Sequence, residues 1–93
     1  MRTIERTTAF KRDYKREKKG RHGGEIDRLL TAVVTILAGD VALPVAFADH
    51  PLSGEWTDHR DCHVKPDLVL IYRKPDGETL QLVRLGSHAE LFR

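Results

Sequence analysis

Ionisable side chains are concentrated in the stretch HRDCHVKPDLVLIY, residues 59–72, which begins with charge and ends as an apolar strand. Along a strand, alternation sends Cys62 and Val64 to one face. We place both in the core, where cysteine usually packs as a small apolar side chain. The opposite face carries His63, and Asp67 follows just past the bend at the next proline. The residues expected on this second face are His59, Asp61 and His63.

Three histidines fall in loops or at the ends of expected elements, namely His50, His63 and His88. Histidine titrates near neutral pH and is the commonest general acid or base in proteins. Together with Asp67 and Arg84, these histidines are a candidate acid–base site if the fold brings them together.

Two chemistries use such a set of side chains. One is metal binding, because His and Asp are common ligands; the sequence has no HExxH, no CxxC and no compact ligand pair on a helix, so we expect no metal. The other is metal-free RNA cleavage. A base takes the proton from a ribose 2′-OH, an acid protonates the leaving 5′-oxygen, and a cation stabilises the charge on phosphorus. Two histidines and one arginine suffice for that reaction.

The elements that must position these groups begin with a short strand at residues 3–7, where TIERT alternates apolar and charged residues. Thr7 or Thr8 is expected to cap a basic helix that starts near Ala9 and ends at Gly20. A second helix follows, with apolar residues at i, i+3, i+4, i+7, i+8 and i+11. Its buried positions are Ile26, Leu29, Leu30, Val33, Val34 and Leu37. The two helices should form an antiparallel hairpin, because only a short glycine turn joins them.

Residues 40–57 lack periodicity and are expected to form a long ordered loop. Its apolar anchors are Leu43, Phe47, Leu52 and Trp56. Three strands are expected after it, at 59–64, 68–74 and 79–85, with an Asp-Gly hairpin turn between the last two. A single helical turn capped by Ser87 ends the chain.

This order of elements predicts an α+β fold over a single domain, residues 1–93. An N-terminal strand comes first, an antiparallel helical hairpin packs on one face of a mostly antiparallel sheet, a short C-terminal turn follows, and the other face is partly open. No run of about 18 apolar residues is present, so we expect no membrane-spanning helix. The basic N-terminus lacks the apolar segment of a secretory signal, and the one cysteine fits a reducing cytoplasm.

The net charge of +2 conceals an asymmetry. Residues 1–21 contain nine Lys or Arg and three Asp or Glu, a balance of +6, whereas residues 22–93 have a balance of −4. The N-terminal end therefore attracts polyanions. A charge run of this kind is often only a solvated helix face, so it is weak evidence for RNA when taken alone.

Three blocks, DHPLSGEW, RDCHVKPDLVLIY and RLGSHAELF, resemble in this order the YafQ branch of the RelE toxin superfamily. The resemblance covers nearly the whole chain. It implies a toxin of a type II toxin–antitoxin system that cleaves mRNA in the ribosomal decoding site and is neutralised by an antitoxin of the DinJ/RelB kind. The family often has an aromatic residue after the Pro-Asp pair, where this chain has Leu68; we expect that side chain to face the sheet interior or its rim.

The resemblance also assigns roles to individual residues. His50 is expected to be the base and His88 the acid, although the two roles are exchangeable. His63 and Asp67 are expected to orient the substrate or tune proton transfer. Arg84 corresponds to the family's basic residue near the scissile phosphate, and Phe92 is expected to stack on an mRNA base. The residues expected to hold ribosomal RNA phosphates are Lys11, Arg12, Lys15, Arg16, Lys18 and Lys19.

Two rival functions stay open at this point. A small RNA- or ribosome-binding protein would block translation without cutting, but binding alone has no need of paired acid and base groups. A metallohydrolase would use the same side chains and would lose its activity in excess chelator. The exposed basic helix also suits an acidic antitoxin.

Overall fold

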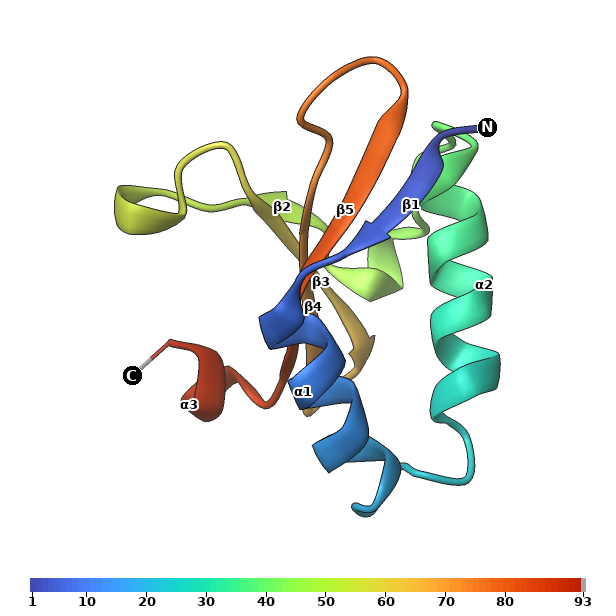
Figure 1. Ribbon diagram of the computed structural model, residues 1–93, viewed down its shortest axis with the longest axis vertical. Helices are drawn as coiled ribbons and strands as arrows, with labels where there is room; N and C mark the ends of the chain where they lie inside the picture. The colour runs from blue at the N-terminus through green and yellow to red at the C-terminus, as the bar shows by residue number, and fades with distance from the viewer. Residues whose placement is uncertain (93) are drawn as a thin grey trace.

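A five-stranded sheet forms the centre of the computed structural model, which describes residues 1–92 (Figure 1). The elements in chain order are β1 (Thr3–Arg6), α1 (Thr8–Lys18), α2 (Ile26–Ala38), the 3-10 turn η1 (Val45–Phe47), β2 (His50–Pro51), the 3-10 turn η2 (Gly54–Trp56), β3 (Arg60–Lys65), β4 (Leu68–Arg73), β5 (Thr79–Gly86) and α3 (His88–Leu91). The α+β class predicted from the sequence is confirmed.

The strands lie in the order β1-β5-β4-β3-β2. β1 runs parallel to β5, and the other neighbouring pairs are antiparallel. The register shifts twice, between His63 and Lys65 of β3 and opposite Ile71 and Tyr72 of β4. Shifts of this kind are bulges, which bend a strand and redirect its side chains. Each bulge lies next to a residue of the candidate site.

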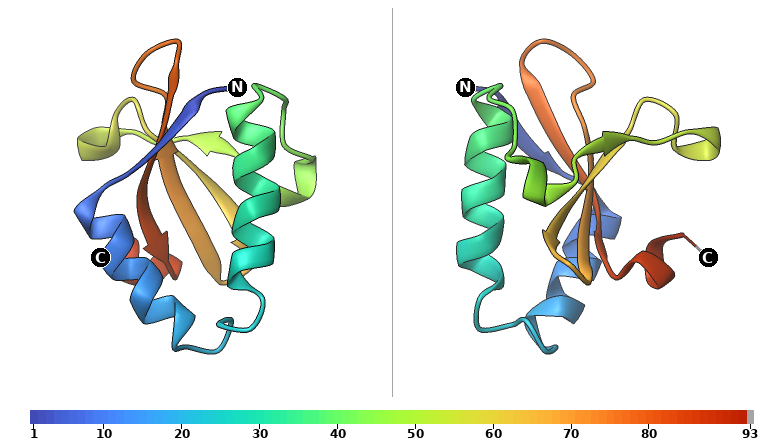
Figure 2. Two further views of the ribbon diagram at one scale, coloured as in Figure 1. Left: turned by 45° about the vertical axis from the view of Figure 1, so that its right-hand side comes forward. Right: turned by 180° about the vertical axis from the view of Figure 1, so that it is seen from behind.

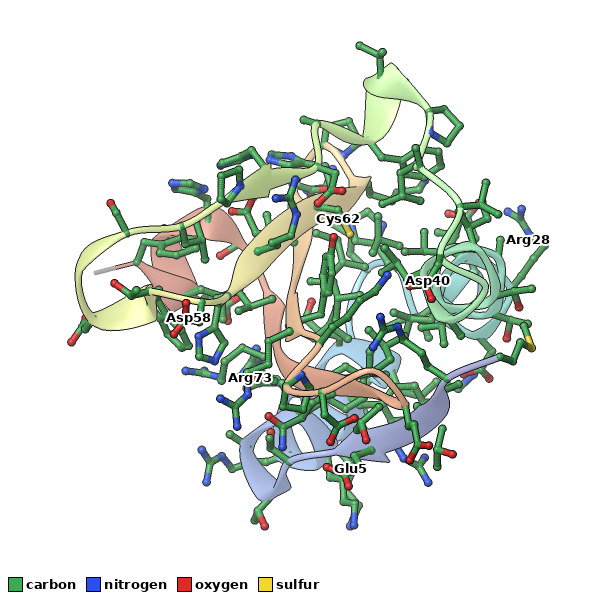
Figure 3. All side chains as sticks on the ribbon, turned by 90° about the horizontal axis from the view of Figure 1, so that it is seen from above. Glu5, Arg28, Asp40, Asp58, Cys62 and Arg73 are labelled. Carbon is green, nitrogen blue, oxygen red and sulfur yellow. The ribbon has the colours of Figure 1, made fainter. Side chains whose placement is uncertain are left out.

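The two long helices, α1 and α2, bury the face of the sheet that is opposite the histidines. Thr7 caps α1, since its hydroxyl accepts a hydrogen bond from the amide of Phe10. α2 presents the apolar face expected from its periodicity, and the helices run in opposite directions but are splayed apart (Figure 1). Cys62 and Val64 lie in this core, as expected, and Figure 3 shows Cys62 inside the molecule. Leu68 is also fully buried here, so its expected place in the sheet interior is confirmed.

The second face of the sheet is less open than expected. A smaller apolar cluster of Val69, Ile71 and Leu91 lies on it, and Leu52, Trp56, Val83 and Phe92 pack around that cluster. The segment from β2 to η2 and the helix α3 extend over this side, opposite α2 (Figure 2, right). A small second core therefore supports the candidate site from below.

Residues 40–57 form the expected long connection, but they also contain a short strand that the sequence did not reveal. β2 is only two residues long, and one of them is a proline, so its pattern is too short to be recognised as a strand. Asp49, immediately before β2, accepts hydrogen bonds from the hydroxyl of Tyr72 at 2.6 Å and from Nε of Arg60 at 3.2 Å. These bonds fix the loop that presents His50 to the sheet.

Among residues 1–92, no helix combines the length and the apolar character needed to cross a membrane.

Candidate active site

Four residues on four neighbouring strands form one row across the second face of the sheet. His50 of β2 pairs with Asp61 of β3, Asp61 with Ile71 of β4, and Ile71 with Arg84 of β5. Residues that face each other across strands point their side chains to the same side. His63 belongs to the next row, where it pairs with Val69. The site therefore has an apolar floor and ionisable groups around it.

The ring of His50 is held by its Nδ1 atom. This nitrogen lies 2.8 Å from the carbonyl oxygen of Ala48 and 3.0 Å from Oδ1 of Asp61, and both neighbours are acceptors. Nδ1 must therefore carry a proton, which leaves Nε2 unprotonated in the neutral ring. The His50 side chain is 51% exposed. Its free nitrogen is available to a substrate as a base.

Asp61 was expected on the same face as His63 but was not included among the candidate site residues. Its side chain is fully buried, and within residues 1–92 neither carboxylate oxygen has a well-directed hydrogen-bond partner. The contact with His50 is close but poorly aligned, because the Nδ1–H is directed at Ala48. Burial raises the pKa of Asp61, and the nearby His50, His63 and His88 oppose that rise. Its position in the HRDCH block, two residues before His63 and facing the same way, was the sequence signal that could have added Asp61 to the candidate site.

His63 lies next to the bulge of β3 and is half-buried. Its Nδ1 is 3.3 Å from the carbonyl oxygen of Pro66, so this ring also has Nε2 free. His59, which was expected on the same face, packs edge-on against Trp56 with ring centroids 5.3 Å apart. Its Nδ1 lies 3.1 Å from the carbonyl oxygen of Thr57. His59 thus belongs to the rim of the site.

The bulge of β5 decides where Arg84 points. Leu82 and Leu85 both face the helices, because Val83 is the extra residue opposite the β4 strand. Regular alternation from Leu82 would have sent Arg84 into the core. The bulge instead places Arg84 beside Ile71 on the second face of the sheet. The guanidinium lies against the buried carboxylate of Asp13, with Nε 2.6 Å from Oδ2.

The C-terminal turn carries the other two expected residues, His88 and Phe92. Ser87 and Glu90 form a capping box that fixes the start of α3, so the short helix is well defined. The rings of His88 and Phe92 lie 4.6 Å apart, and Phe92 also packs edge-on against Trp56 at 6.4 Å. His88 is exposed and next to an aromatic surface. The helical turn expected from the sequence is confirmed.

Asp67 faces the connection between α1 and α2. Its carboxylate lies 2.8 Å from Nε2 of His22 and 3.2 Å from Nη1 of Arg21. Burial opposes its ionisation, but the hydrogen bond from His22 and the charge of Arg21 keep the pKa of Asp67 below its usual value. The described contacts place Asp67 in an anchor of the helical hairpin. His22 was not among the residues selected from the sequence.

The basic helix contains two kinds of side chain. Lys18 is paired with Asp27 at 2.7 Å, and Arg16 contacts Asp13, Glu17, Glu90 and the carbonyl oxygen of Leu85. Both are partly neutralised within the protein. The exposed basic residues of this set for which residues 1–92 provide no ion pair are Lys11, Arg12, Lys15 and Lys19.

Within residues 1–92, no group of three or more His, Cys, Asp and Glu side chains is arranged to hold a metal ion. Cys62 is buried, and burial raises the pKa of its thiol to about 12, so it is not a nucleophile at neutral pH.

Comparison with known proteins identifies the class as a toxin of a bacterial type II toxin–antitoxin system. The family model that matches residues 2–93 is described as "Bacterial toxin of type II toxin-antitoxin system, YafQ". The chain belongs to this YafQ family, as its three sequence blocks predicted. It is 37% identical over 92 residues to the mRNA interferase toxin YafQ of Escherichia coli K12, which covers 99% of this chain and 97% of that relative.

Solved structures agree with this assignment. The crystal structure of YafQ from E. coli BL21(DE3) matches all of both chains with a TM-score of 0.86 and 34% identity. YafQ in the E. coli DinJ–YafQ complex also matches over both whole chains, with a TM-score of 0.79 and 34% identity. A metal-bound toxin from Helicobacter pylori is 44% identical, with a TM-score of 0.82 over 99% of this chain and all of the other. The predicted fold is that of the family.

Proposed function

We propose that this protein is a ribosome-dependent endoribonuclease that cuts mRNA by metal-free acid–base catalysis. The observation that carries the proposal is the cross-strand row of His50, the buried carboxylate of Asp61 and Arg84 on one face of the sheet, with His63 in the next row. The E. coli relative is named an mRNA interferase, which fits the same chemistry.

His50 is the proposed general base. Its Nδ1–H is directed at the carbonyl oxygen of Ala48, with Asp61 close beside it, so Nε2 accepts the proton of the ribose 2′-OH. The 2′-oxygen then forms a bond to the neighbouring phosphorus. His63 presents the same nitrogen from the next row of the sheet, where it orients the substrate or assists the proton transfer.

His88 is the proposed general acid. As the bond between phosphorus and the 5′-oxygen breaks, protonated His88 donates its proton to that oxygen. The products are a 2′,3′-cyclic phosphate and a 5′-hydroxyl end. Arg84 stabilises the negative charge that develops on the phosphate oxygens. Phe92, beside His88, stacks on a base and holds the strand in register, while Asp67 supports the site through the helical connection.

The openness of the site supports dependence on the ribosome. His50 and His88 are both exposed, beside the smaller apolar cluster of the second face. A flexible single strand is positioned poorly on such a surface, so reaction is fast only when another body presents the mRNA in a fixed shape. Contacts to ribosomal RNA phosphates are proposed for Lys11, Arg12, Lys15 and Lys19, the basic residues of this set that form no ion pair within residues 1–92.

A DinJ-like antitoxin is the proposed partner, because the relative in the DinJ–YafQ complex has the same fold. An open groove of about 710 Å³ between α1, α2 and β1 is the proposed seat of its apolar segment. Phe10, Tyr14, Leu30 and Val34 line the groove, and Lys11, Lys15 and Arg6 are basic residues beside them. Such a surface fits an amphipathic segment with acidic flanks.

Thr31 of α2 lines this groove and Thr35, one turn later, does not. We expect Thr31→Arg to weaken antitoxin binding at least tenfold and to leave toxicity intact, while Thr35→Arg binds normally. Equal binding by both variants would place the antitoxin elsewhere.

The proposed activity is tested by adding the purified protein to ribosomes programmed with a defined mRNA and mapping the ends of the products. Wild type and His88→Ala are run side by side, with naked mRNA as the control. We expect cuts within the decoding-site codon that leave 5′-hydroxyl ends and disappear in the variant. Stalled but uncut mRNA would show that the chain blocks translation by binding.

The metal-dependent alternative has a separate readout. A related toxin from H. pylori has been solved with bound metal, so cleavage is also measured in excess chelator on ribosomes whose integrity is verified by sedimentation. Undiminished cleavage supports the acid–base reaction. Loss of cleavage on intact ribosomes would support metal-assisted hydrolysis.

A further inference from the structure

We propose that Asp13 is a positioning residue of the active site, which holds the guanidinium of Arg84 toward the substrate phosphate and links α1 to the turn that carries His88. This inference rests on the proposed role of Arg84. It assigns a part in the reaction to a buried residue of the basic helix, far from the histidines in the sequence.

The contacts of Asp13 are complete and specific. Its side chain is fully buried. Oδ2 accepts hydrogen bonds from Nε of Arg84 at 2.6 Å and from the amide of Leu85 at 3.0 Å, and Oδ1 accepts from Nη2 of Arg84 at 3.2 Å. Arg84 is thus held by two parallel bonds, which fix the plane of the guanidinium. One charged carboxylate determines both the position and the orientation of this cation.

The free edge of β5 explains why the carboxylate lies there. β1 covers this edge only up to the pair of Arg6 with Leu82, and α1 covers the rest. Thr7 donates its amide to the carbonyl of Leu82 and its hydroxyl to that of Val83, and Asp13 accepts from the amide of Leu85. Asp13 thus substitutes for a neighbouring strand at the point where the bulge redirects Arg84.

The same carboxylate extends to the C-terminal turn through Arg16. Nη1 of Arg16 lies 2.9 Å from Oδ1 of Asp13, and Nε lies 3.3 Å from Oε2 of Glu90 in α3. Glu90 forms the capping box with Ser87, the residue before His88. Gly86 leaves room for this bridge, since a Cβ atom there would lie 2.9 Å from Nη2 of Arg16. Arg84 and His88 are therefore held by one network anchored at Asp13.

This network gives Arg16 a role other than the phosphate contact expected from the sequence. An arginine already bonded to Asp13, Glu90 and a backbone carbonyl has few donors left for RNA. Bridging the carboxylates of α1 and α3 accounts for its contacts.

A double-mutant cycle tests the proposal on programmed ribosomes under single-turnover conditions. The variants are Asp13→Asn, Arg84→Lys, Arg84→Gln and the double substitution Asp13→Asn/Arg84→Lys. Asp27→Asn is the matched control, because it breaks an ion pair of α1, the one between Asp27 of α2 and Lys18 of α1. We expect Asp13→Asn to lower the cleavage rate about 10–100-fold, by analogy with the range found for residues that orient metal-ligating side chains. Arg84→Lys keeps the charge but loses the paired bonds. When Arg84→Lys is already present, Asp13→Asn should therefore lower the cleavage rate by less than about threefold. Asp27→Asn should leave the cleavage rate unchanged.

A sulfur substitution at the scissile phosphate separates positioning from general damage to the fold. Replacing one non-bridging oxygen by sulfur slows the wild type where a guanidinium contacts that oxygen. We expect the penalty to shrink at least threefold in both Asp13→Asn and Arg84→Lys and to remain in Asp27→Asn. Circular dichroism confirms that each variant is folded at the assay temperature. If Asp13→Asn does not fold, the sulfur penalty is measured in Arg84→Lys, which lacks the paired hydrogen bonds to Asp13.

The outcomes distinguish the proposed role of Arg84 in cleavage from the proposed positioning role of Asp13. If Arg84→Lys and Arg84→Gln both cleave at the wild-type rate, the proposed role of Arg84 fails. If both are slow but Asp13→Asn is fast, or its effect is fully additive with an unchanged sulfur penalty, then Asp13 is only structural and this inference is wrong.

Discussion

Nδ1 of His50 lies 3.0 Å from Oδ1 of Asp61, yet the two atoms make no aligned hydrogen bond, because the Nδ1–H points at the carbonyl of Ala48. A buried carboxylate therefore lies beside an exposed imidazole without being fully satisfied. An uncompensated buried charge destabilises a fold. A buried carboxylate kept beneath His50, the proposed base, therefore fits a residue that serves catalysis at the expense of the stability of the fold.

We expect Asp61→Asn to raise the stability of the protein and to lower its activity. Removing the charge relieves the burial penalty, so the melting temperature at pH 7 rises; about 1 kcal/mol corresponds to roughly 4–8 °C in a domain of this size. The cleavage rate on ribosomes falls about tenfold or more, because His50 loses the charge that favours its protonated form during proton transfer.

The pH dependence of stability provides the control for this variant. Burial raises the pKa of Asp61 above 3.8, so the folded wild type takes up a proton before the unfolded chain does. The stability advantage of Asp61→Asn is therefore largest near neutral pH and shrinks as pH falls through the raised pKa toward 3.8. A constant advantage over that range would refute the burial argument.

His88→Ala should reduce cleavage by at least a factor of about 10², the typical contribution of a general acid. The His88 side chain is exposed, so the variant should melt within about 2 °C of the wild type. His59 is the matched histidine, since it lies at the rim against Trp56. We expect His59→Asn to retain most of the rate in the same ribosome assay, and full killing by His88→Ala in cells would remove His88 from the site.

Phe92 should contribute to substrate binding more than to the chemical step. Base stacking on an aromatic ring is worth about 1–3 kcal/mol, so Phe92→Ala should raise the substrate concentration needed for half-maximal rate at least fivefold. Phe92 also packs against Trp56, and Phe92→Leu keeps much of that apolar contact. If Leu restores wild-type binding, Phe92 acts through packing and stacking is excluded.

The basic helix should show two kinds of response to substitution. Replacing Lys11, Arg12 or Lys15 by Gln should weaken binding to ribosomes and reduce the slope of log K against log salt by about 0.7–0.9 for each lost phosphate contact. Arg16→Gln should leave that slope unchanged and lower the melting temperature, because Arg16 bonds to Asp13 and Glu90. Binding curves at four salt concentrations distinguish the two groups.

Acid should break the Asp13 network. Burial alone would raise the pKa of Asp13, but hydrogen bonds from Arg84 and from the Leu85 amide outweigh it, and the pKa is lowered below 3.8. A lowered pKa contributes stability that is fully present above 3.8 and is lost as pH falls through the folded-state value. We expect Asp13→Asn to cost about 2 kcal/mol of unfolding free energy at pH 7, the usual contribution of hydrogen bonds to a charged group, and the difference to shrink below about pH 3.8 in denaturant titrations. An unchanged difference at pH 2 would show that charge plays no part.

Local patterns in the sequence were enough to predict most elements of the fold. The spacing from Ile26 to Leu37 defined α2, alternation sent Cys62 and Val64 into the core, and Ser87 marked the start of α3. These signals depend on side-chain periodicity and capping within a few residues, so they can be read without the rest of the molecule. The three histidine blocks likewise indicated the family.

The arrangement of the site depended on contacts between residues that are far apart in the sequence. β2 exists because His50 and Pro51 pair with β3, and nothing in two residues predicts that pairing. Asp67 joins His22 instead of His63 in the described contacts, because the turn after β3 faces the helical connection.

Arg84 shows the difference most clearly. By sequence alternation from Leu80 and Leu82, its side chain belongs in the core; the sequence indicated that an arginine was needed, but not which way it points. The bulge opposite Ile71 turns it to the second face of the sheet, and within residues 1–92 the carboxylate of Asp13, 71 residues earlier, holds its guanidinium there. A strand fixes its local alternation by itself, whereas a bulge is stable only when the neighbouring strand and helix satisfy the backbone groups it leaves free.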